Sequence, residues 1–358
     1  MTSAASSSSR DLTVLTASDV DTVLAKMDLS LAVAGQAQVF AAYSNKDKKD
    51  EAPGVASIQL PLRHVLQTPA QSMLFMPARV PGTTAIKIVS VPKGGSDGLP
   101  GTTLVLDEVS GKVRAVINAR RLTAVRNAAG SVLSMKILDP EGKKTPQNMV
   151  VFGSGAQADS HVRAFVAAYP SIKTVTVVAR RSTPRSEALV ASLAKAFPAV
   201  KVAQGVASFS AGTAEAGFDL SATVHAADIV CTMTSSEQAL YGAKDIKAGS
   251  HHCLIGSYKP HMREVEDELI QRAGVVLVDS REACGHEAGE LQNVTDDDLV
   301  EIGEVINSEH GAEAKVNSAG DVNVFKSVGL GVQDVAISAL IVQEAERLGL
   351  GTIVPNYD

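Results

Sequence analysis

The chain has 358 residues, of which 45% are hydrophobic and 20% are charged, a profile typical of a globular protein rather than a disordered one. Because single cores usually stop growing beyond about 250–300 residues, the length favours two domains. The formal net charge of −6 at pH 7 gives no general attraction to nucleic acid or to an anionic membrane, so local positive groups would have to hold any anionic ligand.

The first ten residues form a Ser- and Ala-rich run with one Arg and no apolar core, which predicts a disordered tail rather than a secretory signal. A weak organellar transit peptide is the alternative. The cysteines Cys231, Cys253 and Cys284 lack both CxxC spacing and a companion pattern of His or Cys, which argues against a disulfide framework and against a structural zinc site. No apolar run approaches the ~20 residues of a membrane-spanning helix. We therefore expect a cytoplasmic protein with reduced thiols, no bound metal and no membrane or nucleic-acid partner.

The first part of the chain predicts a strand, helices and then a meander. A short strand is expected over residues 12–15, followed by helices up to Ser44 whose starts lie near Asp19 and Asp28. Five apolar or alternating segments with turn-rich connections then predict a largely antiparallel sheet. These segments are residues 56–60, 72–76, 85–89, 103–106 and 113–117. Residues 118–138 have helical spacing of their apolar positions, which predicts a long connecting helix.

After the polar linker 139–148, the pattern changes to strand, turn and helix in repetition, which is typical of an α/β domain with a parallel sheet. Strands are expected over residues 149–152, 174–178, 200–202, 229–232, 252–255 and 275–278. Beyond Glu301 the chain turns helical again, and the helix predicted over residues 332–348 is suited to packing back on the first domain.

The strand Met149–Phe152 runs directly into Gly153-Ser154-Gly155-Ala156-Gln157-Ala158, and a helical segment follows. In a Rossmann-type turn the first Gly allows the tight bend, the second lets the backbone approach a pyrophosphate, and a small third residue lets helix and strand pack closely. The N–H groups at the helix start then face the negative charge. A GxGxxA motif alone is weak, but between this strand and this helix it predicts a dinucleotide site.

The second strand of this domain ends in Ala179-Arg180-Arg181-Ser182, where an NAD-specific domain would usually place an Asp or Glu for the ribose 2′-hydroxyl. Two guanidinium groups and a hydroxyl suit a 2′-phosphate instead, because Arg binds phosphate through bidentate, charge-assisted hydrogen bonds. The sequence therefore predicts NADP(H) as the cofactor, held by Arg180, Arg181 and Ser182. A solvated basic turn is the alternative.

Four ordered segments resemble the ornithine cyclodeaminase/mu-crystallin family, and the likeness extends from about Ile58 to Leu350. They are Leu122–Ser131, Gly153–Ala158, Ile255–Pro260 with Arg263-Glu264, and Val324–Gly329. The resemblance implies an α/β fold: a Rossmann-type NADP(H)-binding domain over residues 139–317, and an α+β substrate-binding and dimerisation domain built from residues 1–138 and 318–358. It also implies a homodimer and hydride transfer between a nicotinamide and a carbon that bears an imine or amine beside a carboxylate.

By the same resemblance Arg63, Lys87 and Arg126 hold the substrate carboxylate, and Lys87 stabilises or protonates an imine nitrogen. A charge such as Lys87 inside an otherwise apolar strand is expensive to bury unless an anion meets it. The alternatives are a wet sheet face for Lys87 and the polar stripe of an amphipathic helix for Arg126. The family pattern further implies that the cofactor is bound by Thr234, Ser257, Ser327 and Gly329, residues that would otherwise be interpreted as turn residues.

One departure from the family pattern concerns chemistry. Cyclodeaminases that convert ornithine to proline resemble one another in an Asp two residues after the glycine that ends the fifth strand of the nucleotide domain, and here Tyr258 stands at that place. A phenol is a poor base at neutral pH. The expected function is therefore NADPH-dependent reduction of a cyclic ketimine carboxylate. Ornithine-type cyclodeamination and a non-catalytic, crystallin-like protein that holds NADPH or a small ligand are the alternatives.

Overall fold

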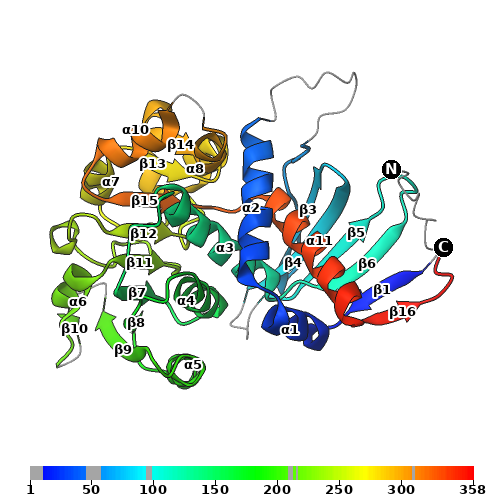
Figure 1. The fold of residues 1–358 in the computed structure, drawn as a ribbon, viewed down its shortest axis with the longest axis horizontal. Coiled ribbons are helices and arrows are strands. Elements are labelled where there is room, and N and C mark those ends of the chain that lie inside the picture. The colour runs from blue at the N-terminus through cyan, green and yellow to red at the C-terminus, as the bar shows by residue number, and fades with distance from the viewer. Residues whose placement is uncertain (1–10, 46–57, 94–98, 209–212, 215–216, 309–310) are drawn as a thin grey trace. The chain divides into compact units, whose positions relative to one another are not determined.

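The computed structural model describes residues 11–45, 58–93, 99–208, 213–214, 217–308 and 311–358. The chain folds into two compact units. The terminal unit contains the chain up to Arg126 together with Leu330–Asp358, and the central unit is Asn127–Gly329. Each unit is built on one β-sheet (Figure 1).

The sheet of the terminal unit has seven strands in the order β16-β1-β6-β5-β4-β3-β2. The strands are β1 (Leu12–Leu15), β2 (His64–Gln67), β3 (Gln71–Val80), β4 (Thr83–Pro92), β5 (Gly101–Leu106), β6 (Val113–Asn118) and β16 (Thr352–Val354). Strands β2 to β6 pair antiparallel in chain order, and β3 to β6 confirm the last four segments of the predicted meander. Strand β1 lies parallel to β6 and antiparallel to β16, so both ends of the chain join one sheet.

Three helices belong to this sheet: α1 (Ala17–Lys26), α2 (Leu29–Ser44) and α11 (Gly331–Leu348). The two aspartates expected near helix starts act as predicted. Asp19 completes a capping box with Thr16, and Asp28 accepts a hydrogen bond from the backbone of Ser30 at the start of α2. Helix α11 packs against α1, α2 and the strands β3 to β5, so it covers one face of the sheet.

The prediction of a strand over residues 56–60 was wrong for residues 58–60, the part that the structure describes. Residues 56 and 57 lie outside the described residues, and Gln59 forms only an isolated bridge with Arg79. Strands β2 and β16 were not predicted. Every residue of both is exposed, so neither carries the apolar alternation that marks a strand in the sequence.

The central unit has a nine-stranded sheet in the order β10-β9-β8-β7-β11-β12-β15-β13-β14, parallel throughout except for the short β10. The strands are β7 (Asn148–Phe152), β8 (Thr174–Ala179), β9 (Lys201–Ser208), β10 (Thr213–Ala214), β11 (Ile229–Thr232), β12 (His251–Leu254), β13 (Val276–Val278), β14 (Leu299–Glu301) and β15 (Asn323–Lys326). The run β9-β8-β7-β11-β12-β15 has the Rossmann order, which reverses direction between β7 and β11. Ligands bind at such a reversal, beyond the carboxyl ends of the strands.

The helices of the central unit follow its strands in the α/β rhythm. They are α3 (Leu122–Ile137), which begins in the terminal unit, α4 (Ala156–Ala168), α5 (Pro184–Ala196), α6 (Leu220–Ala226), α7 (Asp267–Ala273), α8 (Arg281–Glu287), α9 (Ile302–Ile306) and α10 (Ala312–Ala319). Strands β11, β12, β13 and β15 are buried along their whole length, as expected for a sheet covered on both faces. None of the helices in the described ranges is long and apolar enough to span a bilayer.

The units change over at residues 126/127 and 329/330, whereas the sequence placed its boundaries at 138/139 and 317/318. The boundary near the C-terminus lies at 329/330 rather than 317/318 because of the position of β15. This strand pairs in parallel with both β12 and β13, so it lies inside the sheet of the central unit although it comes late in the chain. The functions assigned to the two domains remain predictions.

Candidate functional site

The turn between β7 and α4 has the geometry that its glycines suggested. Gly153 has a φ of +115°, and a Cβ atom at this position would lie 3.0 Å from the carbonyl oxygen of Met233. A side chain would therefore be both strained and crowded here. Gly155 caps α4 without any side-chain hydrogen bond, so the first N–H groups of the helix are left for a ligand. Ala158 is fully buried, as close packing of α4 requires.

A hollow of about 480 Å³ opens beside this turn, at the carboxyl ends of β7, β8 and β11. It brings together five residues that the sequence assigned to the cofactor: Gly153, Ser154, Arg180, Arg181 and Thr234. The remaining lining residues are Val178, Ala179, Thr183, Arg185, Met233, Ser235 and Ser236. The hollow lies at the reversal of strand order, where Rossmann-type sheets bind their ligands.

Three guanidinium groups lie around this hollow. Arg180 and Arg181 follow β8, and Arg185 lies in the first turn of α5. Within the described part of the chain, none of the three forms a hydrogen bond or an ion pair. A terminal nitrogen of Arg185 lies only 3.3 Å from where a Cβ atom on Gly155 would be, so this side chain reaches across the glycine turn.

Arg185 was missed by sequence reasoning. The available signal was its place at the start of a helix, where the macrodipole disfavours a positive side chain unless an anion is bound nearby. Ser182 does not line the hollow; its hydroxyl donates to Glu187 Oε1 at 2.7 Å and accepts from Gln204 Nε2 at 3.0 Å. Ala156 begins α4, and the side-chain oxygen of Gln157 is buried without a hydrogen-bond partner in the described structure.

Thr234 is held by a buried carboxylate. Glu264 is fully buried, and its Oε1 accepts hydrogen bonds from the backbone N and the hydroxyl of Thr234, at 2.6 and 2.8 Å. Its Oε2 accepts from the hydroxyl of Thr232 at 2.8 Å and from Gly256 N at 2.7 Å. Burial raises the pKa of Glu264, although Lys326 and the bonds from Thr234 oppose that shift. Glu264 therefore joins the ends of β11 and β12, and the sequence identified it only as part of a family motif.

The other predicted cofactor residues, Ser257, Ser327 and Gly329, do not line the hollow, and their polar groups bond within the central unit. The hydroxyl of Ser257 donates to the carbonyl of Met262, at 3.0 Å, and its own carbonyl accepts from Lys326 Nζ, at 2.6 Å. Asp279 Oδ2 accepts hydrogen bonds from both the Ser327 hydroxyl and Gly329 N, each at 2.7 Å.

In the terminal unit, Lys87 and Arg126 meet around one buried carboxylate, that of Asp334 in α11. Lys87 Nζ lies 2.5 Å from Asp334 Oδ2, and Arg126 Nε lies 3.3 Å from Asp334 Oδ1. Arg126 also donates to the side-chain oxygen of Gln333, at 3.0 Å. Lys87 is only 5% exposed and Arg126 only 3%, so the wet-face alternative for Lys87 and the polar-stripe alternative for Arg126 were wrong.

Arg63 is exposed just before β2, yet its charge acts on Lys87. Burial lowers the pKa of Lys87; Arg126 and Arg63 add to this shift, and Asp334 opposes it. Burial alone would raise the pKa of Asp334, but the charges of Lys87 and Arg126 hold it below its ordinary value. Lys87 and Arg126 thus share one carboxylate, and Arg63 adds its charge near Lys87, an arrangement of cations that suits an anionic ligand. Asp334 was not predicted, because a buried acid in a helix does not reveal its partner in the sequence.

Other chemistry-bearing residues are engaged elsewhere. His251 bonds the hydroxyl of Ser134, whereas its neighbour His252 bonds Tyr241 and Ser250, so adjacent residues of β12 point apart. Among the described residues, no group of three or more His, Cys, Asp or Glu side chains is arranged to hold a metal. Tyr258 is 43% exposed, and Lys259 Nζ lies 5.6 Å from the centre of its ring.

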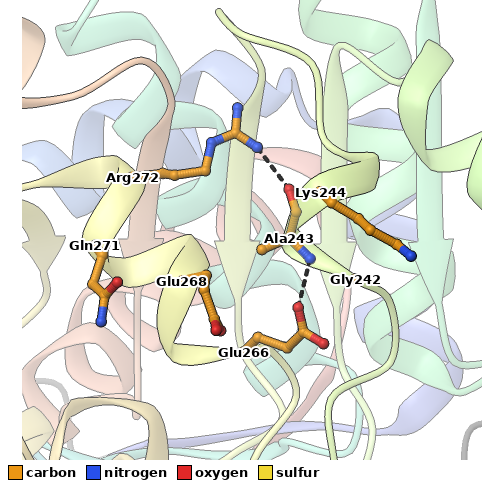
Figure 2. A pocket seen from close by; sticks show the side chains of 7 residues that line it. All are labelled: Gly242, Ala243, Lys244, Glu266, Glu268, Gln271 and Arg272. Atoms are coloured by element: carbon orange, nitrogen blue, oxygen red, sulfur yellow. Dashed lines mark hydrogen bonds between the residues drawn. The ribbon is translucent and has the colours of Figure 1, made fainter.

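A second hollow of about 700 Å³ lies near α7 and contains none of the residues singled out in the sequence (Figure 2). Arg272 there is paired with Asp321, at 2.8 Å, and donates to the carbonyl of Ala243, whose N–H is bound by Glu266. These groups support the local fold and are not free for a ligand. The full lining is Gly242, Ala243, Lys244, Glu266, Glu268, Gln271 and Arg272.

Comparison with known proteins agrees with this geometry. The sequence profile of the ornithine cyclodeaminase/mu-crystallin family matches residues 14–348. The ketimine reductase mu-crystallin of Mus musculus is 30% identical over 240 residues, which cover 67% of this chain and 68% of that protein. The Delta(1)-pyrroline-2-carboxylate reductase of Paracoccus denitrificans is 30% identical over 253 residues, or 68% of this chain and 73% of that protein.

The fold is also that of a solved structure, the Delta(1)-pyrroline-2-carboxylate reductase of Thermococcus litoralis in complex with NADH and L-proline. The two chains superpose with a TM-score of 0.77 at 18% identity, covering 95% of this chain and 99% of that one. The glycine turn, the reversal of strand order beside it and the match over residues 14–348 lead to one conclusion: this chain belongs to the ornithine cyclodeaminase/mu-crystallin family.

Proposed function

We propose that this protein is an NADPH-dependent reductase of cyclic ketimine carboxylates, such as five- or six-membered rings with the C=N bond beside the carboxylate. The observation that carries the proposal is the cation cluster of the terminal unit. Lys87 and Arg126 are buried and both contact the carboxylate of Asp334, and the charge of Arg63 acts on Lys87. Such a cluster of cationic side chains suits a substrate carboxylate next to a group that needs a proton.

The residues of the central hollow fit a nicotinamide dinucleotide. The uncapped start of α4 and the left-handed Gly153 suit a pyrophosphate, and the guanidinium groups of Arg180, Arg181 and Arg185, which pair with no described residue, suit further phosphate. We propose NADP(H) rather than NAD(H), because no acidic side chain at the end of β8 lines the hollow to accept a ribose 2′-hydroxyl. The bound dinucleotide would supply the hydride.

The protein's own groups would supply the proton and the orientation. Arg126 and Arg63 hold the substrate carboxylate, and Lys87 Nζ donates a proton to the imine nitrogen as the carbon receives the hydride. One N–H bond of Lys87 breaks, an N–H bond forms on the product, and water returns the proton to Lys87. The products are a cyclic amino acid and the oxidised dinucleotide.

Tyr258 supports reduction over deamination. Cyclodeamination needs a base that handles the amine and water, and the exposed phenol of Tyr258 stands where ornithine cyclodeaminases carry an Asp. Reduction of a preformed ketimine needs no such base, since only a hydride and a proton are added. The proposed reduction uses Lys87, Arg126 and Arg63 and gives Tyr258 no role.

We also propose that the protein is a homodimer. The face of the meander that points away from α11 is apolar, and its side chains are only partly buried. Pairing of Phe75 with Ile88, Ile86 with Leu104, and Leu104 with Val116 places these five residues on that face. An apolar sheet face of this kind suits a second copy of the same face, and the family resemblance supports this assembly.

The proposal is tested with a panel of cyclic ketimine acids and diamino acids, followed by NADPH absorbance and ammonia release together. We expect NADPH to be consumed with the ketimines and no ammonia to appear. Ammonia without net consumption of NADPH would indicate a cyclodeaminase, and ligand binding without turnover would indicate a non-catalytic binder. Either result would contradict the proposed function.

A further inference from the structure

Asp334 is a buried acidic residue, and packing alone does not explain why a charged side chain occupies this position. Its side chain lies in the first turn of α11, is only 3% exposed, and meets Lys87 and Arg126 with separate oxygens, at 2.5 and 3.3 Å. A buried ion pair adds little net stability compared with apolar side chains of the same size. The retained charge therefore calls for a reason beyond packing.

The charges around Lys87 supply that reason. The groups that act on it come from three segments: Asp334 from α11, Arg126 from α3 and Arg63 from the segment before β2. Burial and the two arginines favour the neutral amine, and Asp334 alone among these charged groups favours the ammonium form. Without this carboxylate, Lys87 would be a buried amine beside two permanent cations, and it would lose its proton at lower pH.

We propose that Asp334 is a positioning residue that keeps Lys87 protonated and holds its Nζ in place, so that Lys87 can donate a proton to the substrate nitrogen. This inference rests on the proposed function. Asp334 itself stays ionised throughout the cycle, because Lys87 and Arg126 hold its pKa low. Burial lowers the pKa of Lys87, and the carboxylate of Asp334 opposes that shift, so the two effects together set how readily Lys87 gives up its proton.

Asp334 also orients Arg126. Its Oδ1 accepts a hydrogen bond from Arg126 Nε, and the side-chain oxygen of the neighbouring Gln333 accepts one from Arg126 Nη1. Two consecutive residues of α11 therefore fix the plane of one guanidinium group. A planar guanidinium held in this way is prepared for a bidentate carboxylate. The same short segment of α11 thus positions both the proposed proton donor and the proposed carboxylate ligand.

The inference is tested by following the titration of Lys87 in protein labelled with ¹³C at the lysine Cε, with the Lys87 signal assigned by its loss in Lys87→Arg. In Asp334→Asn we expect Lys87 to titrate about one to three pH units lower than in the wild type, which is the usual effect of losing one close opposite charge. In Asp334→Glu, which keeps the charge, the titration should stay closer to that of the wild type.

The matched control is Glu344→Gln, which removes another buried carboxylate from α11 but one that is paired with Arg347, at 2.7 Å. It should leave the titration of Lys87 unchanged. If Asp334→Asn fails to fold, Asp334→Ser gives the same test with room for water. An unchanged Lys87 titration in a folded variant that lacks the carboxylate would overturn the proposal.

A second readout links the inference to turnover. The pH at which kcat/KM for a cyclic ketimine falls on the basic side should move down in Asp334→Asn by the same amount as the Lys87 titration. The titration needs neither substrate nor nucleotide, so absence of reductase activity would refute the proposed function and leave the titration result intact. If Asp334→Asn has normal reductase activity and the basic side of its kcat/KM profile does not move, the role proposed for Asp334 is wrong, while the proposed function of the protein stands.

Discussion

The hollow at the carboxyl ends of β7, β8 and β11 is lined by three arginines that pair with no described residue. The chain carries a net charge of −6, and Arg114, Arg163 and Arg281 each pair with a carboxylate. Arg180 and Arg185 do not pair with any described residue and face the same hollow. Sequence reasoning found Arg180 because it ends a strand, and missed Arg185 because only the folded turn brings α5 over Gly155.

These two arginines should affect the cofactors differently. Arg180→Ala removes a group at the end of β8, so the KM for NADPH should rise about tenfold or more while that for NADH changes little. Arg185→Ala removes a group that lies over the glycine turn, so both KM values should rise together. Dissociation constants from fluorescence titration check both results, with Lys195→Ala at the far end of α5 as the control. Equal effects of Arg180→Ala on the two cofactors would contradict the NADP(H) assignment.

At the scale of elements, the sequence predicted most strands and the main helices but not the central strand β15. This strand has only four residues, and it includes Asn323 and Lys326, so it lacks a continuous apolar run. It can be buried because Lys326 Nζ donates to the carbonyl of Ser257, at 2.6 Å, and lies 3.6 Å from Glu290 Oε2. Such long-range compensation cannot be read from local periodicity, and the predicted domain boundary differed for the same reason.

The buried pair of Lys326 and Glu290 gives a stability prediction. Lys326→Met would leave the carboxylate of Glu290 buried without its cation, and should lower the free energy of unfolding of the central unit by about 3–5 kcal/mol. The double variant Lys326→Met with Glu290→Gln should recover part of that loss. Urea denaturation followed by circular dichroism measures both, and equal stability of Lys326→Met and wild type would contradict the role given to this pair.

The strand β12 gives a pH prediction through His252. Burial, together with the charges of His251 and Arg272, lowers the pKa of His252 to about 3, from an ordinary value of 6.5. The unfolded chain therefore binds more protons than the folded one between these values. The stability that depends on neutral His252 is complete above pH 6.5 and is lost as the pH falls below it, by up to about 1.4 kcal/mol per pH unit.

Urea midpoints measured between pH 7.5 and 4.5 check this direction. His252→Gln should show a shallower fall, although some dependence should persist because burial also lowers the pKa of His161. A wild type whose stability rises on acidification over this range would contradict the burial of a neutral His252.

At the scale of the whole molecule, the fold class was predictable because two rhythms are visible along the chain, a meander and then an α/β repeat. The return of the C-terminal segment to the first sheet was only partly predictable. Helix α11 carries a clear apolar pattern, but β16 joins β1 through an exposed strand of three residues. The candidate site was predicted for its cations and not for Asp334, because pairing between Lys87 and α11 depends on the tertiary fold.

The partly buried apolar face of the meander, which points away from α11, predicts the oligomeric state. Analytical ultracentrifugation should give a species of twice the 37.2 kDa chain mass, and Leu104→Glu should dissociate it by placing a charge in the apolar face. Arg114→Glu, at an exposed ion pair, is the control. A wild type that sediments as a single chain at micromolar concentration would contradict the homodimer.

The most direct test of the account follows a hydride from the dinucleotide to the substrate. NADPH with deuterium at both C4 positions of the nicotinamide is incubated with a cyclic ketimine acid, and the product is analysed by NMR and mass spectrometry. The account predicts one deuterium on the ring carbon that bears the carboxylate, formed far more slowly by Lys87→Ala with unchanged NADPH binding. A product without deuterium at that carbon, or equal rates for wild type and Lys87→Ala, would contradict it.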